Sequence, residues 1–337
     1  MLTRRSLCSL FLLALVLLTA CGPDKHHVRI TGEFKNLDNA EFYVYNDGAK
    51  FAGFDTVRIE DGKFRYEKAL EGTEVLTLLY PNFSRTLVVA EPGTTIHITG
   101  DAGKLSDVDV SGTESNERLS KFRHTNQSKP ASNVRMAAAQ YVRDNAATLD
   151  GLVLFLEYFA GEKDFDAPTA LQLLDLLKQK QPDKALVGPL DARLRPLLSN
   201  SARMPLQTFS ATALNGSVVS NATLKGKPAL VVFWANWSSE STDMLNHVKR
   251  LQRAFGKKLQ IVAVSMDTSI PDCRHRVQTD TLTFPTLCDG EAFRSPVAER
   301  LGVRYVPGNI LVDAAGRVVA RDIPAADLES RVSKLME

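Results

Sequence analysis

Short apolar runs alternate with segments of helical spacing in the last third of the chain, and this alternation constrains the fold. The apolar runs predict strands at residues 229–233, 259–264, 283–287, 309–313 and 318–320. The segments of helical spacing predict helices at residues 239–255, 271–279, 293–301 and 325–336. Strands that alternate with helices build a sheet covered on both faces. Residues 203–337 are therefore expected to form an α/β domain with a mixed sheet and flanking helices.

Two segments with different patterns precede this domain. Between residues 28 and 111, short β-branched and aromatic runs separated by turn residues predict an antiparallel β domain, either a sandwich or a small barrel. Asp61-Gly62 lies between two of these runs and predicts a type I′ hairpin. Residues 112–202 have helical spacing, which predicts a helical linker with a break between helices at Gly188-Pro189.

Residues 1–20 have the pattern of an export signal, with a basic start and an apolar core that is short for a transmembrane helix. The small residues before Cys21 resemble a bacterial lipobox, in which the cysteine becomes the lipidated first residue. The resemblance implies a lipoprotein of the cell envelope, held at the membrane by lipid on Cys21. Gly22 implies the outer membrane, facing the periplasm. The alternative is a plain secretory signal with an incidental cysteine.

Charge and composition exclude other classes of function. The chain has 41 basic and 39 acidic side chains, and Arg4 and Arg5 account for the difference. Once residues 1–20 are removed the chain is neutral, so we do not expect it to bind nucleic acid. The β domain has no cluster of His and Cys and no phosphate-binding loop, and we expect neither a metal nor another cofactor.

A tryptophan-rich turn, Trp234-Ala235-Asn236-Trp237, joins the first predicted strand of the α/β domain to its first helix. Other motifs follow the expected order around this turn, at residues 226–228, 262–267, 284–287 and 302–307. With these motifs the segment resembles the thioredoxin superfamily, in particular membrane-tethered thiol–disulfide oxidoreductases and the peroxiredoxin-like group beside them. The upstream part is similar in layout to lipoproteins that join an N-terminal β domain and a helical linker to such a module.

The resemblance implies a Cys-x-x-Cys redox site at the start of the helix, but Ser238 and Ser241 occupy the two thiol positions. A serine hydroxyl is too weakly acidic to replace a thiolate, although it is a good helix cap. We therefore interpret the site as degenerate. The family also implies a cis bond at Pro307, facing the site. Trp237 and the backbone edge of Val306 would then contact an extended peptide.

Two more cysteines, Cys273 and Cys288, are expected at the carboxyl ends of neighbouring strands, and therefore at one edge of the sheet. They could form a structural disulfide in an oxidising compartment, remain unpaired core residues, or serve as a relocated redox pair. Arg274, His275 and Arg276 are of the kind that lowers the pKa of a neighbouring thiol, here Cys273.

Three functions remain open. The first is a thioredoxin-fold lipoprotein that lacks disulfide exchange and binds a peptide or protein between the Ser238 turn and Pro307. The alternative is an enzyme, a thiol–disulfide oxidoreductase or a peroxiredoxin-like antioxidant protein that uses Cys273 and Cys288. The third is a scaffold whose β domain makes the functional contacts. A serine hydrolase is disfavoured because no pattern of His and acid partners accompanies Ser238, and His247, which is nearby in sequence, has no orienting frame.

Overall fold

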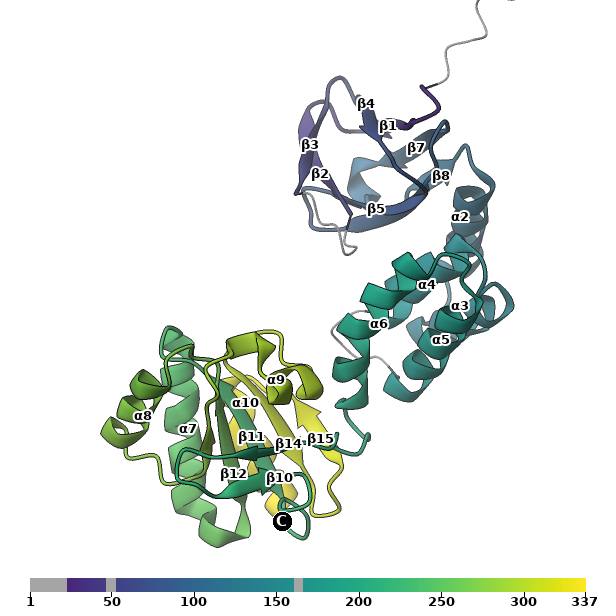
Figure 1. Ribbon diagram of the computed structural model, residues 1–337. Coiled ribbons are helices and arrows are strands. Elements are labelled where there is room, and N and C mark those ends of the chain that lie inside the picture. Colours follow the sequence, from purple (N-terminus) through teal and green to yellow (C-terminus); the bar gives the residue numbers. More distant parts are fainter. Residues whose placement is uncertain (1–22, 47–52, 161–165) are drawn as a thin grey trace, which may run out of the picture. The chain divides into compact units, whose positions relative to one another are not determined.

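The computed structural model describes residues 23–46, 53–160 and 166–337 (Figure 1). The predicted signal peptide and Cys21 lie outside these residues. The described residues form two compact units. The first holds the residues up to 160 together with residues 176–187, and the second holds residues 166–175 and 188–337.

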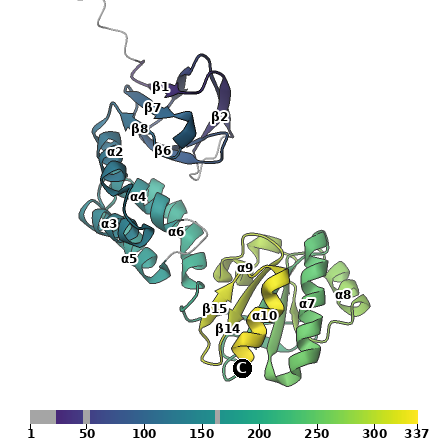
Figure 2. The same ribbon diagram turned by 180° about the vertical axis from the view of Figure 1, so that it is seen from behind.

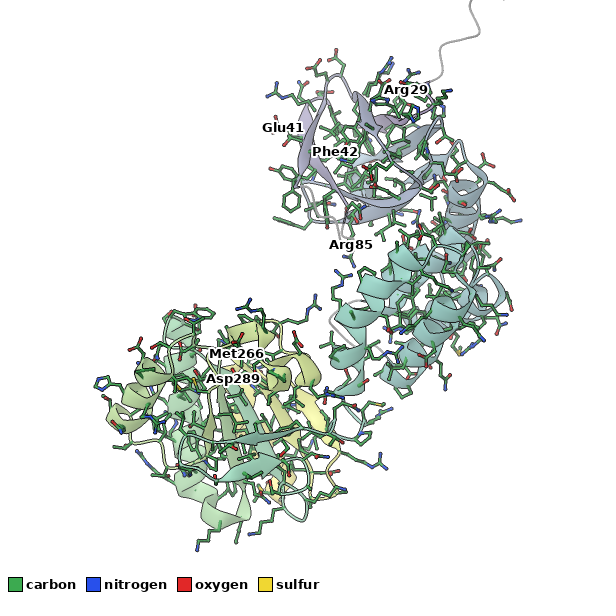
Figure 3. The ribbon with its side chains drawn as sticks, viewed as in Figure 1. Arg29, Glu41, Phe42, Arg85, Met266 and Asp289 are labelled. Atoms are coloured by element: carbon green, nitrogen blue, oxygen red, sulfur yellow. The ribbon has the colours of Figure 1, made fainter. Side chains whose placement is uncertain are left out.

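Two sheets of four strands form the first part of unit one. One has the order β4-β1-β7-β8, with bounds Lys63–Ala69, His27–Lys35, Thr95–Asp101 and Asp109–Ser111. The other has the order β3-β2-β5-β6, with bounds Asp55–Ile59, Ala40–Tyr45, Glu74–Leu79 and Arg85–Ala90. β1 and β7 pair in parallel, and the other pairs among these strands are antiparallel. Ile30, Phe42 (labelled in Figure 3) and Leu76 are buried in a core shared by both sheets. The predicted antiparallel β fold is confirmed.

The type I′ turn predicted at Asp61-Gly62 is confirmed, but the strands beside it pair only at Glu60 and Lys63. The two residues have φ angles of 48° and 75°, as a type I′ turn requires. Glu60 and Lys63 exchange backbone hydrogen bonds across the turn. Beyond that pair the strands separate, because β3 joins the sheet of β2 and β4 joins the sheet of β1. The turn therefore carries the chain from one sheet to the other.

Helix α2 is tied to both sheets through buried polar side chains. Asn116 exchanges two hydrogen bonds of 2.9 Å with the backbone of Val89 in β6. The Ser120 hydroxyl accepts from the Val110 N–H in β8 at 2.8 Å and donates to the carbonyl of the same residue at 2.7 Å. The helices of this region are α2 to α6, at Glu114–Asn126, Ala131–Asp144, Leu149–Phe159, Ala167–Lys180 and Lys184–Ser199, after the short 3-10 helix η1 at Ala102–Lys104.

The break predicted at Gly188-Pro189 is wrong, because α6 continues through it. A proline inside a helix removes one backbone hydrogen bond and crowds the preceding turn. Apolar side chains on both sides of Pro189 are buried, among them Val187, Leu190 and Leu194. Their burial stabilises the helix by more than the lost bond destabilises it.

Unit two contains a mixed sheet of five strands, in the order β13-β12-β11-β14-β15. The strands are β11 at Ala229–Trp234, β12 at Gln260–Ser265, β13 at Thr286–Leu287, β14 at Gly308–Val312 and β15 at Val318–Arg321. β11, β12 and β13 are parallel, whereas β14 and β15 are antiparallel to their neighbours. A small hairpin of β9 at Ser210–Thr212 and β10 at Val218–Ser220 precedes the sheet. This architecture confirms the predicted mixed α/β sheet.

Helices cover both faces of this sheet. Leu230, Val232 and Trp234 of β11 face a core shared with α7 at Ser239–Phe255 and α10 at Ala325–Met336, which lie side by side in Figure 2. The alternate side chains, Val231 and Phe233, face α9 at Pro296–Leu301. Helix α8 at Ile270–Thr279 adds Cys273 to the first of these cores. Every residue of β11 is buried, so the strand fixes the start of the turn that follows it.

The helix predicted at residues 293–301 is two shorter pieces, the 3-10 helix η3 at Ala292–Arg294 and α9. Ser295 lies between them in an extended conformation, with φ −53° and ψ 129°. A residue before proline is disfavoured in the helical region, and Pro296 follows it. A third 3-10 helix, η2 at Gly256–Lys258, directly follows α7.

Candidate functional site

The tryptophan-rich turn runs from the end of β11 to the start of α7, and its two serines hold it in place. Ser238 is the N-cap of α7, and its Oγ accepts from the Ser241 N–H at 3.2 Å. The Ser241 Oγ accepts from the Ala235 N–H at 3.2 Å. Both side chains are buried, with 6% and 1% of their residue surface exposed. The hydroxyls at the two thiol positions therefore stabilise backbone groups of the turn.

Among the residues that the structure describes, neither hydroxyl has an effective general base beside it. The Ser238 hydroxyl donates to the Glu240 carboxylate at 3.2 Å. The pKa of Glu240 is lowered by its own backbone N–H and by the hydroxyls of Ser239 and Ser238, so this carboxylate is a weak base. His247 faces α10, where its Nδ1 lies 2.7 Å from Oε1 of Glu329. The histidine belongs to an ion pair between two helices, and no triad forms at Ser238.

Asp267 holds the turn against the end of β12. Its carboxylate accepts from the backbone N–H of Asn236 at 2.8 Å and from the Asn236 side-chain amide at 3.0 Å. It also accepts from the Ser265 hydroxyl at 2.7 Å. Asp267 is only 4% exposed, and such charge-assisted bonds are the stronger kind in proteins. Asn236 directly precedes Trp237, so a buried carboxylate sets the position of the exposed tryptophan.

The Val306–Pro307 bond is cis, as the resemblance implies. Phe233 at the end of β11 is paired with Gly308 at the start of β14. Pro307 directly precedes Gly308, so the proline lies beside the point at which the tryptophan-rich turn begins. Val306 and Pro307 are half-buried. The structure therefore brings the predicted binding residues to one edge of the sheet.

Four exposed apolar side chains lie at this same edge: Trp237, Ile270, Phe293 and Tyr305. Trp237, Ile270 and Phe293 follow β11, β12 and β13, and Tyr305 precedes β14. These strand ends meet at one edge of the sheet. Met266 and Asp289, labelled in Figure 3, mark the ends of β12 and β13 there. Trp237 is 64% exposed, and its ring centroid lies 6.5 Å from that of Phe293. We refer to the four side chains, with Val306 and Pro307, as the Trp237 face.

The two thiols meet beneath this edge. Cys273 is fully buried in α8, and Cys288, which follows β13, is half-buried. The Cys273 thiol faces the Cys288 sulfur, and the Gly290 N–H and the Ser265 hydroxyl lie beside that sulfur. The prediction that the two cysteines lie at one edge of the sheet is confirmed.

The pKa values of the two thiols move in opposite directions. The hydrogen bond from Cys273, helped by Ser265 and Gly290, outweighs burial and lowers the pKa of Cys288 to about 7. The hydrogen bond to Cys288, together with burial, raises the pKa of Cys273. The prediction of a lowered pKa at Cys273 is therefore wrong. Of the two thiols, Cys288 therefore forms the thiolate more readily, and the thiolate is the reactive form.

Comparisons with known proteins agree with this fold. Residues 203–321 match the AhpC/TSA family model, and residues 28–119 match a domain of unknown function, DUF4369. The thioredoxin-like protein YneN of Bacillus subtilis is 31% identical over 118 residues. That match covers 34% of this chain and 66% of the relative, so the chain spans just under two thirds of the relative's length. By these matches the C-terminal α/β domain is thioredoxin-like.

Solved structures similar to the thioredoxin-like domain include two thiol-disulfide oxidoreductase domains. A C-terminal domain of a putative thiol-disulfide oxidoreductase from Bacteroides thetaiotaomicron is 20% identical, with a TM-score of 0.39. The alignment covers 41% of this chain and 97% of that one. A thioredoxin domain from Bacteroides vulgatus is 25% identical, with a TM-score of 0.38, and the alignment covers 41% of this chain and 99% of that one.

The thioredoxin-like domain uses two residues that sequence reasoning did not single out, Ser265 and Asp267. The available signal was their position directly at the end of a buried strand, next to the strand that leads into the turn.

Among the described residues, no group of three His, Cys, Asp or Glu side chains is placed to hold a metal ion. None of the helices that the structure describes has both the length and the apolar character needed to cross a membrane.

Proposed function

We propose that this protein is a lipid-anchored, thioredoxin-fold accessory protein of the bacterial envelope that binds an extended peptide or protein segment. The segment would lie on the Trp237 face, along the backbone edge of Val306. Disulfide exchange at Ser238 and Ser241 would be absent. The observation that carries the proposal is that both serine hydroxyls are buried and serve the backbone, while Trp237 beside them is exposed.

The surface chemistry supports a polypeptide as the ligand. Isolated exposed apolar side chains are common, but Trp237 and Phe293 are in contact, and both lie at the edge that carries Ile270 and Tyr305. Tryptophan and tyrosine are enriched among the residues that dominate binding energy at protein interfaces. Val306 is only half-buried, and its carbonyl and N–H would pair with an added strand.

Binding can be measured with a probe that is permanently unfolded, such as reduced and carboxymethylated ribonuclease A. Isothermal titration with the mature chain should show binding that Trp237→Ala weakens by about tenfold or more, the loss expected for a central interface aromatic. Phe83→Ala is the matched control, because Phe83 is an exposed aromatic residue of unit one. Equal affinity in wild type and Trp237→Ala, or no binding by the wild type, would contradict the proposal.

A second candidate function is supported by the contact between the two thiols. A thiol–disulfide oxidoreductase or peroxide-reducing protein that uses Cys273 and Cys288 needs a thiolate with a second thiol in reach. Cys288 and Cys273 meet both conditions. This candidate requires a measurable two-electron potential that either Cys→Ser variant abolishes. Free thiols that resist alkylation in the native protein would remove it.

The membrane anchor and the outer-membrane, periplasm-facing location rest on the sequence around Cys21. A cell grown with radiolabelled palmitate should label the wild-type protein and leave a Cys21→Ser variant unlabelled. Labelled protein should then sediment with the outer membrane after density-gradient separation of the two membranes. An unlabelled wild type would leave the plain secretory signal as the correct interpretation.

A further inference from the structure

A single hydroxyl connects the thiol pair to the Trp237 face. The Ser265 Oγ donates to the Asp267 carboxylate at 2.7 Å. Ser265 and Cys288 directly follow Val264 and Leu287, which are paired in the sheet, so the hydroxyl also lies beside the thiol pair. A serine hydroxyl has one proton to donate. A Cys288 thiolate and the Asp267 carboxylate therefore compete for the same proton.

The charges compete as well. Asp267 is buried and acts on both sulfurs through its negative charge. When Cys288 is a thiolate, two negative groups share a poorly solvated region, where their repulsion is stronger than in water. Asp267 is also the residue that binds the backbone and the side chain of Asn236, next to Trp237. The charge on Cys288 thus affects Asp267, the residue that positions the turn.

We propose that a disulfide between Cys273 and Cys288 is a redox switch that tightens the Trp237 face around its polypeptide partner. The inference rests on the partner-binding function proposed above. It adds a covalent modification site and a means of regulating that function. Neither Ser238 nor Ser241 takes part.

The oxidant in this proposal is a low-molecular-weight disulfide, such as glutathione disulfide. The Cys288 thiolate attacks one of its sulfurs, the S–S bond of the oxidant breaks, and one thiolate leaves. Cys273 then passes its proton to that leaving thiolate and attacks the Cys288 sulfur, which releases the second thiolate. Two thiols of the protein are oxidised to one disulfide, and one disulfide of the oxidant is reduced to two thiols. The exchange needs no other reactant.

Oxidation changes the surroundings of Asp267 in two ways. It removes the negative charge of the Cys288 thiolate, and it leaves a neutral disulfide, which is a poor acceptor for the Ser265 proton. Ser265 then donates fully to Asp267. The carboxylate holds Asn236 more firmly, and a partner meets a turn that is already ordered, which lowers the entropy lost on binding.

The test uses the chain from residue 21 onward with Cys21→Ser, which leaves Cys273 and Cys288 as its only cysteines. Glutathione disulfide should abolish alkylation of both thiols, as measured by intact mass. Acrylamide quenching then reports on Trp237, because the second tryptophan, Trp234, is buried. Affinity for carboxymethylated ribonuclease A should rise by about fivefold or more on oxidation, within the usual range of coupling between sites.

Two variants make the outcome specific. Cys273→Ser/Cys288→Ser should bind the probe with an affinity that the oxidant does not change. Ser265→Ala should still form the disulfide but lose the gain in affinity and the change in quenching. If wild type binds the probe equally in both redox states, or if no disulfide forms, the switch is refuted. If the disulfide forms and quenching changes but no probe binds, the switch stands and the partner-binding function fails.

Discussion

Replacing Asp267 by alanine should destabilise the thioredoxin-like domain and release the Trp237 turn. The carboxylate accepts three hydrogen bonds, two from Asn236 and one from Ser265. A hydrogen bond to a charged group contributes about 1.5–3 kcal/mol. Asn236 is exposed, so in the variant water can replace part of the hydrogen bonding that Asn236 loses. The variant also no longer bears the desolvation penalty of a buried carboxylate. We therefore expect a net loss of about 2 kcal/mol, the value of one charged bond rather than three.

Urea unfolding followed by tryptophan fluorescence measures this loss, because both tryptophans lie in unit two. With a slope of about 2 kcal/mol per molar urea, Asp267→Ala should lower the midpoint by about 1 M. Asp243→Ala is the matched control, since that carboxylate is exposed and lies 3.8 Å from His247. It should lower the free energy of unfolding by no more than about 0.5 kcal/mol. Equal midpoints for the two variants would refute the role given to Asp267.

Two other predictions test different parts of the molecule. Ser238→Cys/Ser241→Cys should gain insulin-reducing activity, because a cysteine at the N-terminus of α7 acquires a lowered pKa. The same variant should lose about 1 kcal/mol of stability, because it lacks the serine hydroxyls that cap the helix. In unit one, burial raises the pKa of Asp150, but hydrogen bonds from Arg118 and Tyr141 and the charge of Arg118 outweigh it and keep the pKa below its usual value. The stability that the charged Asp150 gives to the folded state is complete above about pH 4 and is lost as the pH falls through the lowered pKa. The urea midpoint of unit one, followed by far-UV circular dichroism, should therefore fall more between pH 7 and pH 3 in wild type than in Asp150→Asn, and equal falls would contradict this account.

Local signals predicted the elements whose ends are fixed by neighbouring residues. Helix α7 begins after its cap, Ser238, and stops before Gly256, and its bounds agree with the prediction. The cis bond at Pro307 followed from the family resemblance. The type I′ turn at Asp61-Gly62 was predicted correctly, but its flanking strands pair only at Glu60 and Lys63, because turn chemistry fixes only the turn. Which sheet each strand joins depends on partners far away in the sequence.

The candidate site shows the same limit. The sequence placed Cys273 and Cys288 at one edge but assigned the lowered pKa to the wrong thiol. Charged neighbours of Cys273 in sequence suggested that assignment, whereas the largest cause of the lowered pKa of Cys288 is the thiol of Cys273, helped by Ser265 and Gly290. Asp267 was passed over for a related reason. A buried carboxylate gains its role only from the donors that the fold brings to it.

The most direct test of the central claim, a thioredoxin-like domain without exchange chemistry at Ser238 and Ser241, is insulin reduction by the mature wild-type chain with dithiothreitol as reductant. Ser238→Cys/Ser241→Cys serves as the positive control and Cys273→Ser as the test of the second thiol pair. The wild type should reduce insulin no faster than dithiothreitol alone. Turnover by the wild type close to that of the positive control, and undiminished by Cys273→Ser, would contradict the claim.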